Sequence, residues 1–325
     1  MGWWLLNADT LARSRFVVSP LAETTAALLT LEHGPAEHPA ARAWVERHRP
    51  AYRARLAADP VTAALLRAAF TARWNADFLT PAPIGDTAAF AGELARVRAA
   101  PPDVVRADLA VALGGGPLPA ELADRTDLAD RAADLLAWVW AETVEPDWAR
   151  RRRILEADVV ARTRQLGDGG WAAALDDLRP GMRWLGEGRL QINAHDNPPR
   201  RISGARMLFV PVTFRQGWAC WDEPRLYALV YPCTGVLAGA ADRPGPAPLA
   251  ALLGPARATV LTLLDTPKST TVLVALTGQV LGSTGRHLRV LRDAGLVDRR
   301  RAGRSVLYYR TEAGEVLVRA AGGAP

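Results

Sequence analysis

The sequence has few of the residues that support redox, metal or membrane functions. It contains two cysteines in 325 residues, Cys220 and Cys233, which form no Cys-x-x-Cys pair, so neither a disulfide framework nor a thiolate metal site is expected. No run approaches the roughly 20 apolar residues that a transmembrane helix needs, and the N-terminal residues lack the features of a secretory signal peptide. We therefore expect a soluble, cytoplasmic protein that binds no metal and no other cofactor.

Catalytic motifs are missing as well. No Ser/His/Asp arrangement and no pair of carboxylates stands out, and the loop at residues 114–117 has neither the preceding strand nor the following Lys-Ser/Thr of a phosphate-binding loop. His195 lies in a polar stretch ending in Pro198-Pro199, which is typical of a turn. The sequence therefore predicts that the protein is not an enzyme.

Positive charge is concentrated at the C-terminal end. Residues 251–325 hold eleven basic and five acidic side chains and so carry the whole net charge of +6, while the preceding 250 residues are neutral overall. A small module that carries all the excess charge is typical of a protein that binds a polyanion, most often nucleic acid. We expect the Arg150–Arg153 run to lie on a solvated helix with local acidic partners; a second contact to the DNA backbone is the alternative.

Length and hydrophobic periodicity predict a mainly α protein with one small antiparallel sheet, an α+β fold. Residues 1–184 are predicted to form a mostly helical N-terminal domain, and residues 185–239 a small β-rich segment packed on it. Pro211 lies inside an apolar run of that segment, which predicts an edge strand or a bulge. Residues 240–249 are predicted to be a linker before a separate domain at 250–325.

Residues 250–325 follow a regular pattern. Helices are predicted at residues 256–264, 271–277 and 282–294, and two strands follow on either side of Ala302-Gly303-Arg304. Gly295 suits the left-handed position after the third helix. Leu281, Leu288 and Leu291 are expected on the buried face of that helix. Three helices and a basic hairpin predict a C-terminal winged helix-turn-helix.

The same residues resemble a known family. Residues 282–297, Gly-Ser-Thr-Gly-Arg-His-Leu-Arg-Val-Leu-Arg-Asp-Ala-Gly-Leu-Val, and residues 303–310, Gly-Arg-Ser-Val-Leu-Tyr-Tyr-Arg, are similar to ArsR-type winged helix-turn-helix transcriptional regulators. A weaker similarity to an actinobacterial subgroup with a long N-terminal region rests on residues 18–24, residues 77–81, and Pro211, Phe214, Trp218 and Tyr231-Pro232. The resemblance implies a transcriptional repressor. The places where family members bind metals hold no Cys or His here, which excludes metal sensing at those places.

Charge and resemblance together predict a regulator that binds double-stranded DNA as a homodimer at a pseudo-palindromic operator, because one recognition helix buries too little surface for high specificity. The N-terminal end of the third helix is expected to enter the major groove. The residues expected to contact base edges or the groove are Ser283, Thr284, Arg286 and His287. Those expected to contact phosphates, partly from the hairpin, are Arg289, Arg299, Arg300, Arg301, Arg304 and Arg310.

The neutral N-terminal region is expected to sense an effector, to form the dimer, or both. Aromatic residues gather near the two cysteines and predict a pocket for a small apolar or planar effector, with packing in a sheet core as the alternative. The candidate pocket residues are Trp218, Cys220, Trp221, Tyr227 and Tyr231. Two other functions remain open: a small-molecule-binding or enzymatic N-terminal domain with an accessory winged helix, and an adaptor that binds a partner protein.

Overall fold

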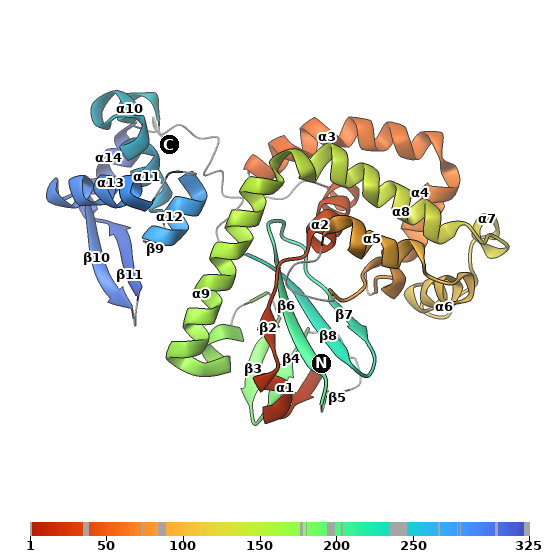
Figure 1. The fold of residues 1–325 in the computed structure, drawn as a ribbon. Helices are drawn as coiled ribbons and strands as arrows, with labels where there is room; N and C mark the ends of the chain where they lie inside the picture. Colours follow the sequence, from red (N-terminus) through yellow and green to blue (C-terminus); the bar gives the residue numbers. More distant parts are fainter. Residues whose placement is uncertain are drawn as a thin grey trace. The chain divides into compact units, whose positions relative to one another are not determined.

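The computed structural model divides the chain into two compact units. Residues 1–149 and 169–233 form the first, called here the N-terminal unit, and residues 150–168 and 234–325 form the second, the C-terminal unit (Figure 1). The structure describes residues 2–34, 39–72, 74–83, 89–175, 178–179, 181–193, 199–202, 204–233, 246–265, 267–277, 279, 281–302 and 305–321.

Helices make up most of the N-terminal unit. They are α1 (Ala8–Ala12), α2 (Pro20–His33), α3 (Pro39–Ala58), α4 (Pro60–Ala69), α5 (Phe90–Arg98), α6 (Pro102–Ala112), α7 (Ala120–Ala123) and α8 (Leu128–Val139), with the short turns η1 (Asp77–Leu79), η2 (Trp140–Val144) and η3 (Glu145–Asp147). Helix α9 (Trp148–Leu175) is divided between the units and is interrupted at Gly170, whose φ of 68° is left-handed. The strands are β1 (Trp3–Leu6), β2 (Arg15–Phe16), β3 (Arg183–Gly186), β4 (Arg189–Gln191), β5 (Arg200–Ile202), β6 (Arg206–Val212), β7 (Ala219–Asp222) and β8 (Leu226–Pro232).

The strands correct the prediction of one small antiparallel sheet, although the α+β class itself is confirmed. There are two four-stranded sheets in this unit, ordered β3-β4-β1-β5 and β2-β6-β8-β7. Strand β6 pairs in parallel with β2 and β8, and β1 pairs in parallel with β5. Strands β1 and β2 come from the first sixteen residues, where only helix was expected. Both sheets are therefore mixed and join residues far apart in the chain.

Burial on both faces explains the parallel pairing of β6 and β8. Residues Met207–Val212 and Leu226–Tyr231 are all buried, and such continuous apolar runs are typical of parallel strands covered on both sides. One side packs against the second sheet, in a core that joins Trp4 and Leu190 to Phe209 and Leu229. Helix α2 also packs against β6. The unbroken apolar runs of these two strands therefore indicate a sheet that is covered on both faces, not one with a face exposed to solvent.

Pro211 fits this arrangement because its neighbouring strand is short. Strand β2 pairs with β6 only at Leu208 and Phe209, and the Val17 N–H donates to the Phe209 carbonyl. Residues two apart on a strand point their backbone groups to the same side, so Pro211 lacks its N–H on the side where β2 has already ended. Strand β6 is therefore not an edge strand, as Pro211 had suggested, but an inner strand whose β2 side is open where the proline lies.

Buried carboxylates fix helix α2 beside the sheet. Pro20–Leu31 are all buried, and the Glu23 carboxylate accepts the Thr213 N–H at 2.8 Å and also the Thr213 hydroxyl. At the start of the helix, Glu93 of α5 accepts the Ser19 hydroxyl and the Leu21 N–H, both at 2.9 Å. These bonds join α2 to β6 and to α5, because each satisfies backbone groups that helix and strand leave open.

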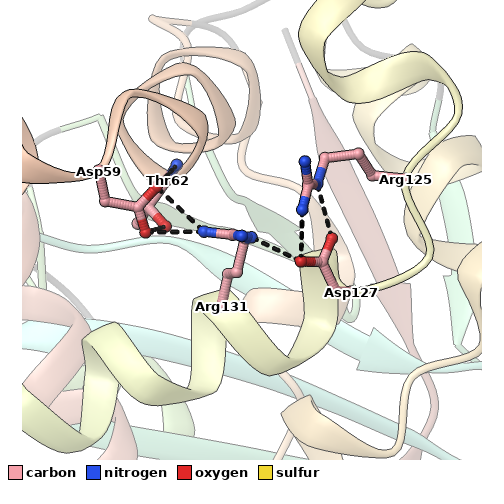
Figure 2. A network of polar contacts seen from close by, with 5 residues as sticks. All are labelled: Asp59, Thr62, Arg125, Asp127 and Arg131. Carbon is pink, nitrogen blue, oxygen red and sulfur yellow. Dashed lines mark hydrogen bonds and ion pairs between the residues drawn. The ribbon is translucent and has the colours of Figure 1, made fainter.

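A second polar network holds the helices together (Figure 2). Asp59 caps α4 by accepting the Thr62 N–H and also accepts Arg131 of α8 at 2.9 Å. Arg131 in turn pairs with Asp127 at 2.7 Å, and Arg125 pairs with Asp127 at 2.7 Å. Hydrogen bonds from Arg125, followed by those from Arg131, hold the pKa of Asp127 below its ordinary value. The network joins the N-terminus of α4 to the start of α8.

The C-terminal unit contains the predicted order of elements together with two that were not expected. Its described elements are α10 (Ala247–Leu253), α11 (Pro255–Leu263), β9 (Lys268–Ser269), α12 (Thr270–Thr277), α13 (Leu281–Asp293), β10 (Val297–Ala302), β11 (Ser305–Arg310) and α14 (Glu312–Ala321). Helix α10 begins inside the stretch 240–249 that was predicted to be a linker, and β9 pairs with β11 to make a three-stranded sheet. Gly295 has a φ of 71°, as its position after α13 predicts.

One apolar core holds this unit together. It includes Leu249 of α10, Leu261 of α11 and the predicted core residues Leu273, Leu276, Leu288, Leu291 and Val297. Leu281 is an exception, because it is 61% exposed at the first residue of α13. In the middle of α9, Ile154 and Leu155 are buried as expected, and the run of arginines divides: Arg151 is buried, whereas Arg152 is exposed and pairs with Glu156 at 2.8 Å.

We predict that the stability of the N-terminal unit falls as the pH rises through the titration of Glu93. Burial is the main cause that raises its pKa from 4.5 to about 7. Between these values the folded state therefore holds a proton that the unfolded state has lost, which costs the folded state on the order of 3 kcal/mol by pH 8. Titration of Asp77 lowers the stability of the folded state over the same pH range, because its pKa is also raised to about 7.

Urea unfolding at pH 5 and pH 8 measures this effect. Glu93→Gln should remove a large part of the loss, since Glu93 accepts both of its hydrogen bonds at one oxygen and Gln retains one such acceptor. The exposed Glu46→Gln is the matched control and should leave the difference as in the parent chain. An identical pH dependence in Glu93→Gln and the parent chain would contradict the prediction.

Candidate functional site

A cationic hollow lies between α13 and the β-hairpin. It has a volume of about 430 Å³ and is lined by Gly282, Gly285, Arg286, Arg289, Arg292, Arg299 and Tyr308. Helix α13 supplies three of the arginines, and Arg299 comes from β10 next to its cross-strand partner Tyr308. Of the predicted DNA-contacting residues, Arg286, Arg289 and Arg299 meet here and are exposed. Four guanidinium groups around one hollow form a surface that attracts anions such as phosphate.

The two half-buried polar side chains of α13 contact each other. The Ser283 hydroxyl lies 3.2 Å from the His287 Nε2, one helical turn further along. Burial, and then the charges of Arg257 and Arg286, lower the pKa of His287. The imidazole is therefore neutral at pH 7 and keeps both a donor and an acceptor nitrogen. Ser283 does not cap the helix, which begins two residues earlier.

Glycines leave part of this helix uncovered. A Cβ added at Gly282 or at Gly285 would meet no atom within 4 Å. Glycine inside a helix costs up to about 1 kcal/mol relative to alanine, and nothing in the described chain requires these two positions to be small. Because glycine has no side chain, the backbone of α13 is uncovered at the hollow, and another molecule can approach it closely there.

Thr284 corrects the prediction of a groove contact. It is 0% exposed and lies four and seven residues before the buried Leu288 and Leu291, on the inner face of α13. Its hydroxyl has no hydrogen-bond partner among the described residues. Thr284 therefore occupies the packing position that periodicity had assigned to Leu281, and it does not reach the surface.

Arg310 was predicted to contact DNA, but the structure gives it a packing role. Its side chain is 8% exposed and pairs with Glu315 of α14 at 2.8 Å. It also donates to the carbonyls of Leu261 and Thr262, at 2.9 and 2.8 Å. These are carbonyls of the last turn of α11, where few backbone donors remain; the Leu261 carbonyl also accepts the Leu264 N–H at 3.3 Å. Arg310 thus joins the hairpin to α11 and α14 and is not available to another molecule.

The remaining hairpin residues lie on different faces. Arg299 and Arg301 share one face of β10 by strand alternation, whereas Arg300 lies on the other face, opposite Leu307 of β11. All three are exposed. Arg304 lies outside the described residues. The sequence had not assigned a contact role to Arg292, Tyr308 or the two glycines; the i, i+3 spacing of 286, 289 and 292 could have indicated the helical arginines.

The predicted effector pocket is only partly as expected. Trp218 and Trp221 line a pocket of about 340 Å³ in the N-terminal unit. Cys220 is on the opposite face of β7 and is fully buried, which raises the pKa of its thiol. Tyr227 and Tyr231 belong to the core between the sheets. These three residues do not line the pocket. Cys220 and Trp221 face opposite ways because successive residues of a strand alternate, whereas Tyr227 lies on the same face as its cross-strand partner Trp221 and is buried in the core.

No protein-family model matches this chain, and the searches of curated proteins and of solved structures returned no significant match. Within the described ranges, no helix combines the length and the apolarity required to cross a bilayer.

We predict that Arg310→Ala destabilises the C-terminal unit by about 2–3 kcal/mol, because it removes the hydrogen bonds to the Leu261 and Thr262 carbonyls and the ion pair with Glu315. Hydrogen exchange should show faster exchange in α11 and α14. Arg289→Ala, which removes an exposed arginine of the same unit, is the control and should change stability by less than about 0.5 kcal/mol. Unchanged exchange in Arg310→Ala would refute the packing role.

Proposed function

We propose that the chain is a DNA-binding transcriptional regulator whose residues 250–321 act as an ArsR-type winged helix-turn-helix. In this proposal α13 is the recognition helix and β10 and β11 form the wing. The order of three helices and a hairpin, α11, α12, α13, β10 and β11, supports it. The resemblance of residues 282–297 and 303–310 to the ArsR family supports repression as the direction of control.

The observation that carries the proposal is the cationic hollow along α13. Arg286, Arg289 and Arg299 are exposed around it, and its described lining contains no acid. Asp298 accepts the Tyr309 hydroxyl on the other face of the hairpin. Asp293, the last residue of α13, pairs with one of the lining arginines, Arg292, at 3.4 Å. A helix end with bare backbone and arginines on both sides suits a major groove, whose walls are phosphates.

A homodimer is part of the proposal, because two half-sites supply the specificity that one helix lacks. Two large apolar side chains, Leu252 and Val316, are 68% and 53% exposed. They come from α10 and α14, which contact each other. An apolar surface on two adjacent helices is consistent with a subunit interface.

We predict that the protein protects a two-fold symmetric site in the DNA upstream of its own gene and binds it more tightly than random DNA. Arg286→Ala should cost about 1–3 kcal/mol on that site if the side chain reads a base. Arg299→Ala should weaken all DNA alike and lower the slope of log K against log salt by about one. Footprinting and fluorescence anisotropy at several salt concentrations measure these effects.

Thr284→Val is the matched control on the same helix, since it changes a buried side chain of similar volume and should leave the preference intact. A parent chain that binds upstream and random DNA equally, with a slope unaffected by Arg299→Ala, would refute the proposed function.

We further predict opposite effects of Gly285→Ala on stability and on DNA binding. The extra methyl group meets nothing within the chain and should stabilise α13 by about 0.5–1 kcal/mol. It would also occupy the surface that the DNA must approach, so affinity for the upstream site should fall. Thermal unfolding and anisotropy on one preparation measure both, and tighter DNA binding would contradict the close approach.

A further inference from the structure

The pocket of the N-terminal unit has aromatic walls. Besides Trp218 and Trp221 it is lined by Trp4 and Trp74, and its volume of about 340 Å³ lies in the range of small-molecule sites. The ring centroids of Trp74 and Trp221 are 5.5 Å apart at an interplanar angle of 64°, and those of Trp4 and Trp221 are 6.4 Å apart at 67°. Four indole rings around a pocket of this size suit a flat apolar group.

An arginine that has no carboxylate partner in the described part of the chain lines the same pocket. The Arg179 Nη2 donates one hydrogen bond, to the Ile192 carbonyl at 2.8 Å, and within the described part of the chain no carboxylate pairs with this guanidinium. Burial lowers its pKa to about 10. The pocket's other arginine, Arg200, is paired with Glu223 and lies 4.2 Å from the Trp221 ring centroid. A guanidinium partly withdrawn from water is ordinarily paired, and Arg179, which is half-buried, has no carboxylate partner among the described residues.

A neighbouring residue supports an anion at this position. The Trp218 indole N–H is buried and has no acceptor among the described residues, so this pocket residue holds a second unused donor. The adjacent Gly217 is required by the strand, because an added Cβ would lie 2.9 Å from the Val230 carbonyl oxygen, whereas its distance of 3.5 Å from the Arg179 Cδ would be an ordinary contact.

We propose that this pocket binds a small planar organic anion, an aromatic carboxylate, with its ring among the tryptophans and its carboxylate on Arg179. The ring accounts for the indole walls, and the carboxylate supplies a counterion for Arg179, which has none among the described residues. That such a ligand acts as the effector of DNA binding rests on the proposed function above, whereas the binding site itself does not.

Asp77 makes the binding depend on pH. It lines the same pocket, and burial, with the charges of Asp108 and Glu223, raises its pKa to about 7 against the opposing effects of Arg200 and a hydrogen bond with the Trp221 side chain. A bound carboxylate adds a negative charge nearby and so favours the protonated Asp77. Affinity should therefore fall as the pH rises from 6 to 8, and Asp77→Asn should remove most of that dependence.

Isothermal titration calorimetry of the full-length protein without DNA tests the site with 1-naphthoate and its neutral analogue 1-naphthamide. We expect the parent chain to bind the carboxylate at least about tenfold more tightly than the amide. Arg179→Gln should remove that difference, and it should unfold at an equal or higher temperature because it removes an unpaired charge. The exposed Arg201→Gln is the matched control and should behave as the parent chain.

Two results with the parent chain alone would overturn the proposal. One is the absence of saturable 1-naphthoate binding up to about 1 mM. The other is equal affinity for the acid and the amide. Tight binding of inorganic phosphate in place of the carboxylate would also overturn the proposal, since the aromatic walls would then have no role. Because these titrations contain no DNA, a failure of the DNA-binding proposal leaves their outcome unchanged. Adding 1-naphthoate to the anisotropy measurement then tests its role as an effector.

Discussion

The N-terminal unit depends on one buried carboxylate. Strand β2 ends after Phe16, so beyond Phe209 the backbone of β6 has a partner strand only on the β8 side, and Pro211 offers no N–H on the other side. Glu23 fills the gap, because its carboxylate accepts the N–H and the hydroxyl of Thr213. An acid at 0% exposure is costly unless it is hydrogen-bonded in this way. Helix α2 is therefore held against β6 at a defined position, and the helices that pack on α2 follow from it.

Local signals predicted the helices well and the sheets poorly. Ser19-Pro20 and Asp59-Pro60 are local signals of a helix start, and α2 and α4 begin at these prolines, because capping depends on residues close in sequence. Parallel pairing depends on strands far apart, such as β1 with β5, and no local pattern fixes it. The unbroken apolar runs of β6 and β8 held the relevant signal, since antiparallel strands with a solvated face alternate.

Local sequence patterns also predicted only part of the candidate DNA-binding surface. Charge and spacing predicted a helix and a hairpin that the structure contains, and Arg286, Arg289 and Arg299 meet at one hollow. Spacing alone could not tell that α13 begins at Leu281 and turns Thr284 inward. Nor could it tell that the carbonyls at the end of α11 would bind Arg310. Both differences arise from neighbours distant in sequence, which decide whether a polar side chain faces solvent.

The partners of a buried arginine distinguish packing from binding more clearly than its burial does. Arg310 has an acid and two helix-terminal carbonyls, so its hydrogen bonds are made within the chain and its charge is balanced. Arg179 has one carbonyl and no acid among the described residues, although desolvation lowers its pKa. A fold gains nothing from an unbalanced charge beside four tryptophans, since an apolar residue of similar volume would pack there at lower cost. Its presence is therefore best explained by an anion that comes from outside the chain.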